Sequence, residues 1–196
     1  MPRDKSGTHD RLAPIVKAEF MEWGYEKASV NRIAERAGMS PAGLYKHYAG
    51  KKDMFASLVE ETVAAFDAFC GETQRAMSAD FAGADPFGDA WMDALLDFLY
   101  AHYDAFFLLV CRSAGSGYQG FEERLIEREA ESCKAFAAQM NAGSAVTDGQ
   151  WHLVASVYVH AVADIFRRGY RREQARAHMR FLQAVLFPGW KSLFEQ

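Results

Sequence analysis

The chain has 196 residues, half of them hydrophobic, which is long enough to bury a substantial core as one large or two small domains. Its apolar runs fall short of the ~20 residues that span a bilayer, and the stretch from Met1 to Lys5 lacks the apolar segment of a signal peptide. We therefore expect a cytoplasmic protein rather than a membrane protein. The three cysteines form no CxxC pair, which favours reduced thiols over a disulfide framework or a zinc site.

The formal net charge of −4 is unevenly distributed along the chain. Residues 1–55 hold ten basic and seven acidic side chains, whereas residues 56–196 hold twelve basic and nineteen acidic ones. Attraction to a polyanion such as nucleic acid is therefore expected only at the N-terminal end.

Hydrophobic residues recur at helical spacing along almost the whole chain, and no alternating run predicts a strand, so the predicted fold class is all-α. The first helix is predicted over residues 10–23 and ends at Gly24, which tolerates positive φ. Its inward stripe includes Leu12, Val16, Phe20 and Trp23.

Two short helices are predicted next. Ser29 is placed to cap one that ends at Gly38, and Ser40 with Pro41 is placed to begin another that reaches Tyr48. A short helix, a tight turn and a second short helix form a helix-turn-helix.

The outward face of that second short helix is small at its N-terminal end and rich in hydrogen-bond donors after it. This face can enter the ~12 Å wide major groove of DNA. A plain helical hairpin with solvated side chains is the alternative that the motif alone leaves open. The face consists of Pro41, Ala42, Gly43, Tyr45, Lys46 and His47.

The segment from Ala28 to Tyr48 reads ASVNRIAERAGMSPAGLYKHY and is followed by KKD at residues 51–53. It resembles the DNA-binding domain of the tetracycline-repressor (TetR) family, and the resemblance covers about residues 9–60. It implies a ligand-responsive repressor, a homodimer of nine or ten helices per chain that binds a palindromic operator in double-stranded DNA. An N-terminal helix-turn-helix domain would occupy residues 1–52, and a C-terminal ligand-binding and dimerisation domain residues 53–196.

The resemblance also implies roles for single residues. Ser29, Tyr45 and Lys51 match positions that contact phosphates, and Pro41 to Gly43 with Lys46 and His47 match base-reading positions. Phosphate contacts fix the register of such a protein on DNA, and base contacts select the sequence. The complete set of expected DNA contacts is Ser29, Arg32, Ser40, Pro41, Ala42, Gly43, Tyr45, Lys46, His47 and Lys51.

Beyond residue 52, helices are predicted at about 53–78, 87–102, 104–113, 120–141, 148–169 and 173–187. The last two carry apolar stripes that could pair with a second copy as a four-helix bundle or fill the chain's own core. The stripes are Trp151, Val154, Tyr158, Val162 and Ile165, then Met179, Leu182, Val185 and Leu186.

Aromatic residues are dense between residues 66 and 121, where they could line a pocket for a small hydrophobic or aromatic effector or simply pack as core. The candidates for contact with the effector are Trp91, Phe98, His102, Phe106, Tyr158 and His160. The arginines at 167, 168, 171 and 172 are interpreted as complementing a helix C-terminus.

The two alternative functions are an enzyme and a constitutive DNA-binding protein. An enzyme is disfavoured because the glycine-rich segment 115–120 lacks the Gly-Lys-Ser/Thr of a phosphate loop, and His160 with Asp164 has no third metal ligand at a recognisable spacing. A constitutive DNA-binding protein without an effector remains the closer alternative. No cofactor, metal or catalytic residue is expected.

Overall fold

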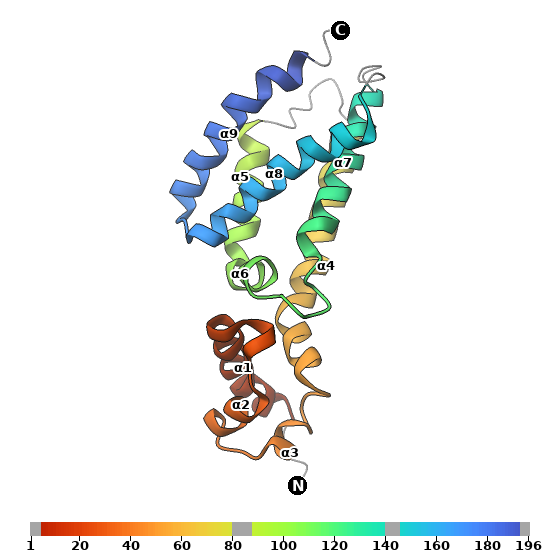
Figure 1. Cartoon of the computed structure of the whole chain (residues 1–196). Coiled ribbons are helices and arrows are strands. Elements are labelled where there is room, and N and C mark those ends of the chain that lie inside the picture. The colour runs from red at the N-terminus through yellow and green to blue at the C-terminus, as the bar shows by residue number, and fades with distance from the viewer. Residues whose placement is uncertain (1–4, 80–87, 140–145, 193–196) are drawn as a thin grey trace. The chain divides into compact units, whose positions relative to one another are not determined.

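The computed structural model describes residues 5–79, 88–139 and 146–192 (Figure 1). Over these ranges the chain forms nine helices and no strand, as the periodicity predicts. The helices are α1 (Lys5–Lys27), α2 (Val30–Arg36), α3 (Pro41–Leu44), α4 (Lys51–Ala79), α5 (Asp89–Ala101), α6 (Tyr103–Cys111), α7 (Phe121–Gln139), α8 (Asp148–Arg168) and α9 (Arg172–Ser192). No single helix in these ranges is both long and apolar enough to cross a membrane, although α5 and α6 would pass if taken together as a bent pair.

The chain divides into two compact units. Unit 1 comprises the chain up to Ala65 together with Asp104–Gln119, and unit 2 comprises Phe66–Tyr103 and the chain from Gly120 onward. Helix α4 contributes its first half to unit 1 and its second half to unit 2. The functional division expected at residue 52 stays a prediction.

The core of unit 1 is built on α1. Leu12, Val16 and Phe20 are fully buried, at the spacing of one helical face. The φ of 70° at Gly24 interrupts α1 where the sequence predicts its end, although a short helical stretch resumes and runs to Lys27. Trp23, predicted to point inward, is 43% exposed, and the guanidinium of Arg32 lies over its ring at 4.8 Å. That prediction was wrong because the indole packs under a neighbouring cation rather than in the core.

The segment Asp104–Gln119 belongs to unit 1 through contacts with α1. The backbone N–H of Tyr25 donates to the carbonyl of Arg112 at 2.8 Å, and Nε of Arg112 donates to the carbonyl of Met21 at 2.9 Å. Lys17 and Asp104 form an ion pair at 2.6 Å. A Cβ at position 24 would lie 3.5 Å from Arg112, which is an ordinary van der Waals contact, so the φ of 70° rather than a lack of space favours glycine here.

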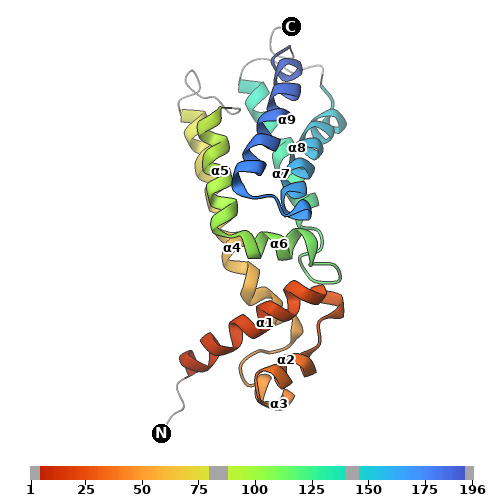
Figure 2. The same ribbon diagram turned by 90° about the vertical axis from the view of Figure 1, so that its left-hand side faces the viewer.

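In unit 2, α7 packs against α8, and α5 lies beside α9 (Figure 2). The α7–α8 interface buries Ile126, Ala130, Trp151 and Ala155. Within the predicted stripes, Trp151, Ile165 and Met179 are therefore buried inside the chain, whereas Val185 is 58% exposed.

Ion pairs at four-residue spacing connect α5 and α9 and form what we term the α5–α9 ladder. Its members are Arg180 with Asp89 at 2.5 Å, Arg176 with Asp93 at 2.5 Å, and Arg172 with Asp97 at 2.6 Å. Arg172 thus pairs across to another helix, while Arg167 pairs with Glu122 and Arg168 with Asp164. The basic cluster expected to complement a helix end is engaged mainly in ion pairs.

Candidate nucleic-acid interface

Helix α2 begins with the predicted cap. Ser29 is extended, with φ −119° and ψ 121°, and its hydroxyl accepts a hydrogen bond from the backbone N–H of Arg32 at 3.5 Å. A hydroxyl at this position satisfies a donor that has no partner inside the helix. Ile33 and Ala34 are the buried residues of this helix.

The turn after α2 depends on Gly38, whose φ is 66°. A side chain is strained at such a φ, which explains the glycine. The backbone N–H of Met39 donates to the carbonyl of Ala34 at 3.0 Å and closes the turn. Ala34 is 1% exposed at this point, so its small side chain permits the close approach of the turn.

Helix α3 starts as predicted and ends early. Ser40 caps it by accepting from the N–H of Gly43 at 3.1 Å, and Pro41 takes the first turn. The regular helix stops at Leu44 rather than reaching Tyr48, so the predicted length was wrong. The physical reason is that the amides of Lys46 and His47 bond three residues back, to Gly43 at 3.2 Å and to Leu44 at 3.0 Å, which tightens the chain into turns.

The outward face of α3 has the expected composition. Pro41, Ala42 and Lys46 are exposed, and Tyr45 is 52% exposed. Gly43 and His47 are half-buried, and Leu44 between them is buried. The base-reading candidates therefore lie together on one short surface, with Leu44 anchoring it.

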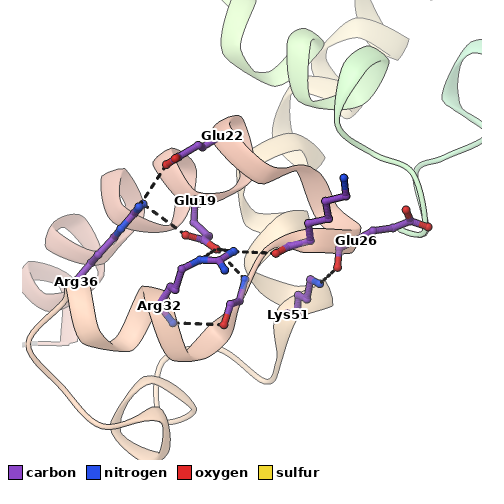
Figure 3. A network of polar contacts seen from close by, with 8 residues as sticks. Glu19, Glu22, Glu26, Arg32, Arg36 and Lys51 are labelled. Carbon is purple, nitrogen blue, oxygen red and sulfur yellow. Dashed lines mark hydrogen bonds and ion pairs between the residues drawn. The ribbon is translucent and has the colours of Figure 1, made fainter.

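Glu19 of α1 is a buried residue that the sequence reasoning missed (Figure 3). Its carboxylate accepts from the backbone N–H of Ser29 at 2.8 Å and from Nε of Arg32 at 2.8 Å, and it pairs with Arg36 at 3.4 Å. The signal was available, because Glu19 lies three residues after Val16 on the apolar stripe. A charge in such a position indicates an internal partner.

Burial of the Glu19 carboxylate raises its pKa, but the opposing effects are larger. Hydrogen bonds from Arg32 and Ser29 and the charges of Arg32 and Arg36 leave the pKa of Glu19 below its ordinary value. Glu19 is therefore ionised at neutral pH.

Two cations expected to contact DNA are held by groups of the chain itself. Arg32 donates to the carbonyl of Lys27 at 2.8 Å in addition to Glu19. Nζ of Lys51 donates to the carbonyl of Glu26 at 3.0 Å and lies 4.9 Å from the centre of the Tyr25 ring. Burial lowers the pKa of Lys51 from its ordinary value.

The chain was compared with known proteins. Residues 17–58 match the family model described as bacterial regulatory proteins of the tetR family. The chain is 30% identical over 150 residues to the HTH-type transcriptional repressor SCO4008 of Streptomyces coelicolor, an alignment that covers 76% of this chain and 67% of that protein. The chain belongs to the TetR family. It is thus a TetR-family transcriptional regulator with a DNA-binding helix-turn-helix, as the motif predicts.

Solved structures of TetR-like proteins share the fold. A TetR-like transcriptional regulator from Rhodococcus sp. RHA1 superposes with a TM-score of 0.58 at 21% identity, covering 91% of this chain and 93% of that one. A TetR family regulator from Chloroflexus aurantiacus gives 0.55 at 18% identity, with 97% and 89% covered. The likeness extends over both units, whereas the family model matches residues 17–58 alone.

The residues expected to contact an effector of this TetR-family chain are distributed over both units. In unit 2 the rings of Trp91 and Tyr158 lie 6.0 Å apart, and those of Phe98 and His102 lie 4.7 Å apart. Phe106 is buried within unit 1 at 2% exposure.

His160, the remaining candidate, is exposed. The hydroxyl of Tyr158 is buried and has no hydrogen-bond partner in the described part of the chain. Burial raises the pKa of Tyr158 well above its ordinary value, and the nearby Glu129 and Cys133 act in the same direction. Glu129 and Cys133 are polar residues near Tyr158 that the sequence reasoning did not single out.

Proposed function

We propose that the chain represses transcription by binding a near-palindromic operator in double-stranded DNA as a homodimer, and that a small hydrophobic or aromatic effector releases it. The observation that carries the proposal is the capped α2–turn–α3 arrangement with its small, donor-rich outward face. The similarity to a protein named as a repressor supports the direction of regulation. A bacterial regulator of this kind acts in the cytoplasm, where the chromosome lies.

In this proposal α3 enters the major groove. Pro41, Ala42 and Gly43 allow close approach of the backbone to the bases, and Lys46 and His47 supply donors for base edges. Contacts to phosphates on either side fix the register. These come from Ser29, Arg32, Ser40, Tyr45 and Lys51.

Dimerisation is supported by apolar side chains that unit 2 leaves exposed. Leu153 and Val157 on α8 are 61% and 40% exposed, and Phe181 and Val185 on α9 are 73% and 58% exposed. Each pair is spaced by four residues, so it lies on one face of its helix. We term these four residues the α8–α9 apolar patch, and a two-fold pairing of the patches would bury them.

Effector control is supported by the course of α4. This helix begins at Lys51, a proposed phosphate contact, and its last turns belong to unit 2, where Trp91, Phe98, His102 and Tyr158 lie. An effector that binds the DNA-incompetent dimer 100-fold more tightly supplies about 2.7 kcal/mol of coupling. Titration of an effector on the DNA complex distinguishes this regulator from a constitutive DNA-binding protein.

The DNA-binding proposal is tested with duplexes selected by the purified protein from a random 30-bp pool, roughly three helical turns long. Lys46→Ala should relax the preference for the selected sequence, whereas Lys51→Ala should weaken selected and random duplexes alike and lower the salt slope by about one per site. Recovery of no preferred sequence would refute the proposal. A Lys51→Ala variant with altered preference and an unchanged salt slope would refute the assignment of roles.

A further inference from the structure

The side chain of Glu19 on α1 is completely buried against the start of α2, and two of its partners, Ser29 and Arg32, face DNA in the proposed function. We term Glu19, Ser29, Arg32 and Arg36 the Glu19 cluster (Figure 3). Glu22, one turn further along α1, also pairs with Arg36 at 3.3 Å but is 53% exposed. Two carboxylates of the same helix thus contact the arginines of α2 from very different environments.

The buried carboxylate is costly unless it is fully compensated. Moving one charge out of water costs several kcal/mol, and only well-placed partners offset that loss. Glu19 is compensated mainly at Oε1, which lies 2.5 Å from Nη2 of Arg32 and accepts from the N–H of Ser29. Within the described residues Oε2 accepts no hydrogen bond and is opposed only by Nη1 of Arg36 at 3.4 Å. Replacing a complete set of buried ionic partners by apolar residues is often neutral or stabilising, so stability alone gives little reason for the whole arrangement. Removing Glu19 alone would leave the N–H of Ser29 and the guanidinium of Arg32 without their acceptor.

The cluster fixes the guanidinium of Arg32 from several directions. Nε and Nη2 of Arg32 contact the carboxylate of Glu19, and Nη2 also donates to the carbonyl of Lys27. The ring of Trp23 lies beneath the guanidinium plane. The same carboxylate holds the backbone of Ser29, the residue that begins α2. Two of the proposed DNA contacts are therefore oriented by one buried group.

The cluster also changes the charge that DNA meets. Glu19 lies within ion-pair distance of both Arg32 and Arg36, and Glu22 pairs with Arg36 as well, so the buried Glu19 is one of two carboxylates that balance these arginines internally. Non-specific affinity for DNA depends on the number of phosphates that cations neutralise, whereas specific affinity depends on the geometry of the contacts. A buried anion at this position lowers the non-specific affinity for DNA and improves the geometry of the contacts on which the specific affinity depends.

We propose that Glu19 is a positioning residue for DNA recognition, which orients Ser29 and Arg32 toward the phosphate backbone and withholds arginine charge from random sequence. The inference rests on the proposed DNA-binding function. It differs from a purely structural role because it predicts opposite effects on selected and random DNA.

The test compares Glu19→Gln with Glu22→Gln, which removes the same charge from an exposed site on the same helix. Both variants and the parent are titrated with the duplex selected by the parent and with a scrambled duplex of equal composition, over a series of salt concentrations. Glu19→Gln should bind the selected duplex about tenfold more weakly, which corresponds to about 1.4 kcal/mol. It should bind the scrambled duplex more tightly, with a salt slope steeper by up to about one per protomer.

Glu22→Gln should leave affinity for the selected duplex unchanged within about threefold, because Glu22 pairs with Arg36, which is not one of the proposed DNA contacts. Equal weakening of both duplexes by Glu19→Gln would show a structural role only and overturn the inference. Equal behaviour of the two Gln variants would overturn it as well. If the parent itself selects no sequence, the proposed function fails, a result distinct from either of these.

Arg32→Lys provides a second variant in case Glu19→Gln loses its helical circular dichroism. Lysine keeps the charge that pairs with Glu19 but lacks the planar fork. We expect weaker binding of the selected duplex and an unchanged salt slope on the scrambled one. An Arg32→Lys variant that retains full affinity for the selected duplex would overturn the inference.

Discussion

The exposed apolar patch on α8 and α9 yields a quantitative prediction for Phe181→Ala. Full burial of a phenylalanine side chain stabilises by about 1.5–3 kcal/mol, and 73% of Phe181 is exposed in the single chain. If a partner covers that fraction, each copy contributes about 1–2 kcal/mol, and a two-fold interface contains two copies. The dimer should therefore weaken by about 2–4 kcal/mol, a roughly 30- to 1000-fold increase in the dissociation constant.

Sedimentation velocity over a concentration series measures this constant directly. Alanine is the best helix former, and Phe181 is largely exposed within its own chain, so the fold of each chain should be retained in circular dichroism spectra. Tyr45→Ala is the matched control, because Tyr45 is an aromatic residue 52% exposed directly after α3 in unit 1. It should leave dimerisation unchanged. A dissociation constant for Phe181→Ala within threefold of the parent would refute this placement of the interface.

Three further predictions concern stability. Asp93→Asn breaks a ladder pair whose side chains are both 32% exposed, and it should lower the free energy of unfolding by about 1–2 kcal/mol. Asp97→Asn, at a side chain that is 67% exposed, should lower it by less than about 0.5 kcal/mol. Urea denaturation in low and high salt measures both variants, and equal losses of unfolding free energy would contradict the reasoning. Burial raises the pKa of Glu129, so the charged form of this side chain lowers the stability of the fold as pH rises above the ordinary carboxyl range. Glu129→Gln should therefore raise Tm at neutral pH but not near about pH 4. Gly38→Ala should lower the free energy of unfolding by about 1 kcal/mol through its φ of 66° alone. Gly115→Ala should lower Tm further, since its Cβ would also meet Glu26 Cγ at 2.7 Å. A lower Tm for Gly38→Ala than for Gly115→Ala in thermal melts would be inconsistent with this.

Much of the fold was predictable because capping and helical periodicity are local. Ser29 and Ser40 cap the helices that the sequence assigns to them, and the predicted bounds of α5 to α8 lie within two residues of those observed, except that residues 87, 140 and 141 of the predicted helices lie outside the described residues. The length of α3 was not predictable from pattern alone, since its last residues keep helical spacing while their hydrogen bonds tighten.

The contacts between distant elements could not be deduced in the same way. Asp93 and Arg176 each lie in a regular repeat of four, yet nothing local indicates that the two helices run side by side. Glu19 illustrates the same limit for the candidate site, because its place on an apolar stripe indicates a buried partner without identifying Arg32. Of the residues predicted to face outward, Pro41, Ala42, Tyr45 and Lys46 are exposed, whereas Gly43 and His47 are half-buried. Their contacts with DNA stay a prediction.

The four-residue repeat of the α5–α9 ladder has a consequence for the alignment of the two helices. If α9 slid by the four residues that separate the pairs, about 6 Å, two of the three named pairs would re-form with new partners. Phe181 and Val185 are also four residues apart, so the apolar patch would nearly superpose on itself after the same step. The repeat alone therefore leaves two alignments of α9 against α5 close in energy. The hydroxyl of Tyr100, which donates to the carbonyl of Tyr170 at 2.5 Å just before α9 begins, matches only the observed alignment and acts as its stop.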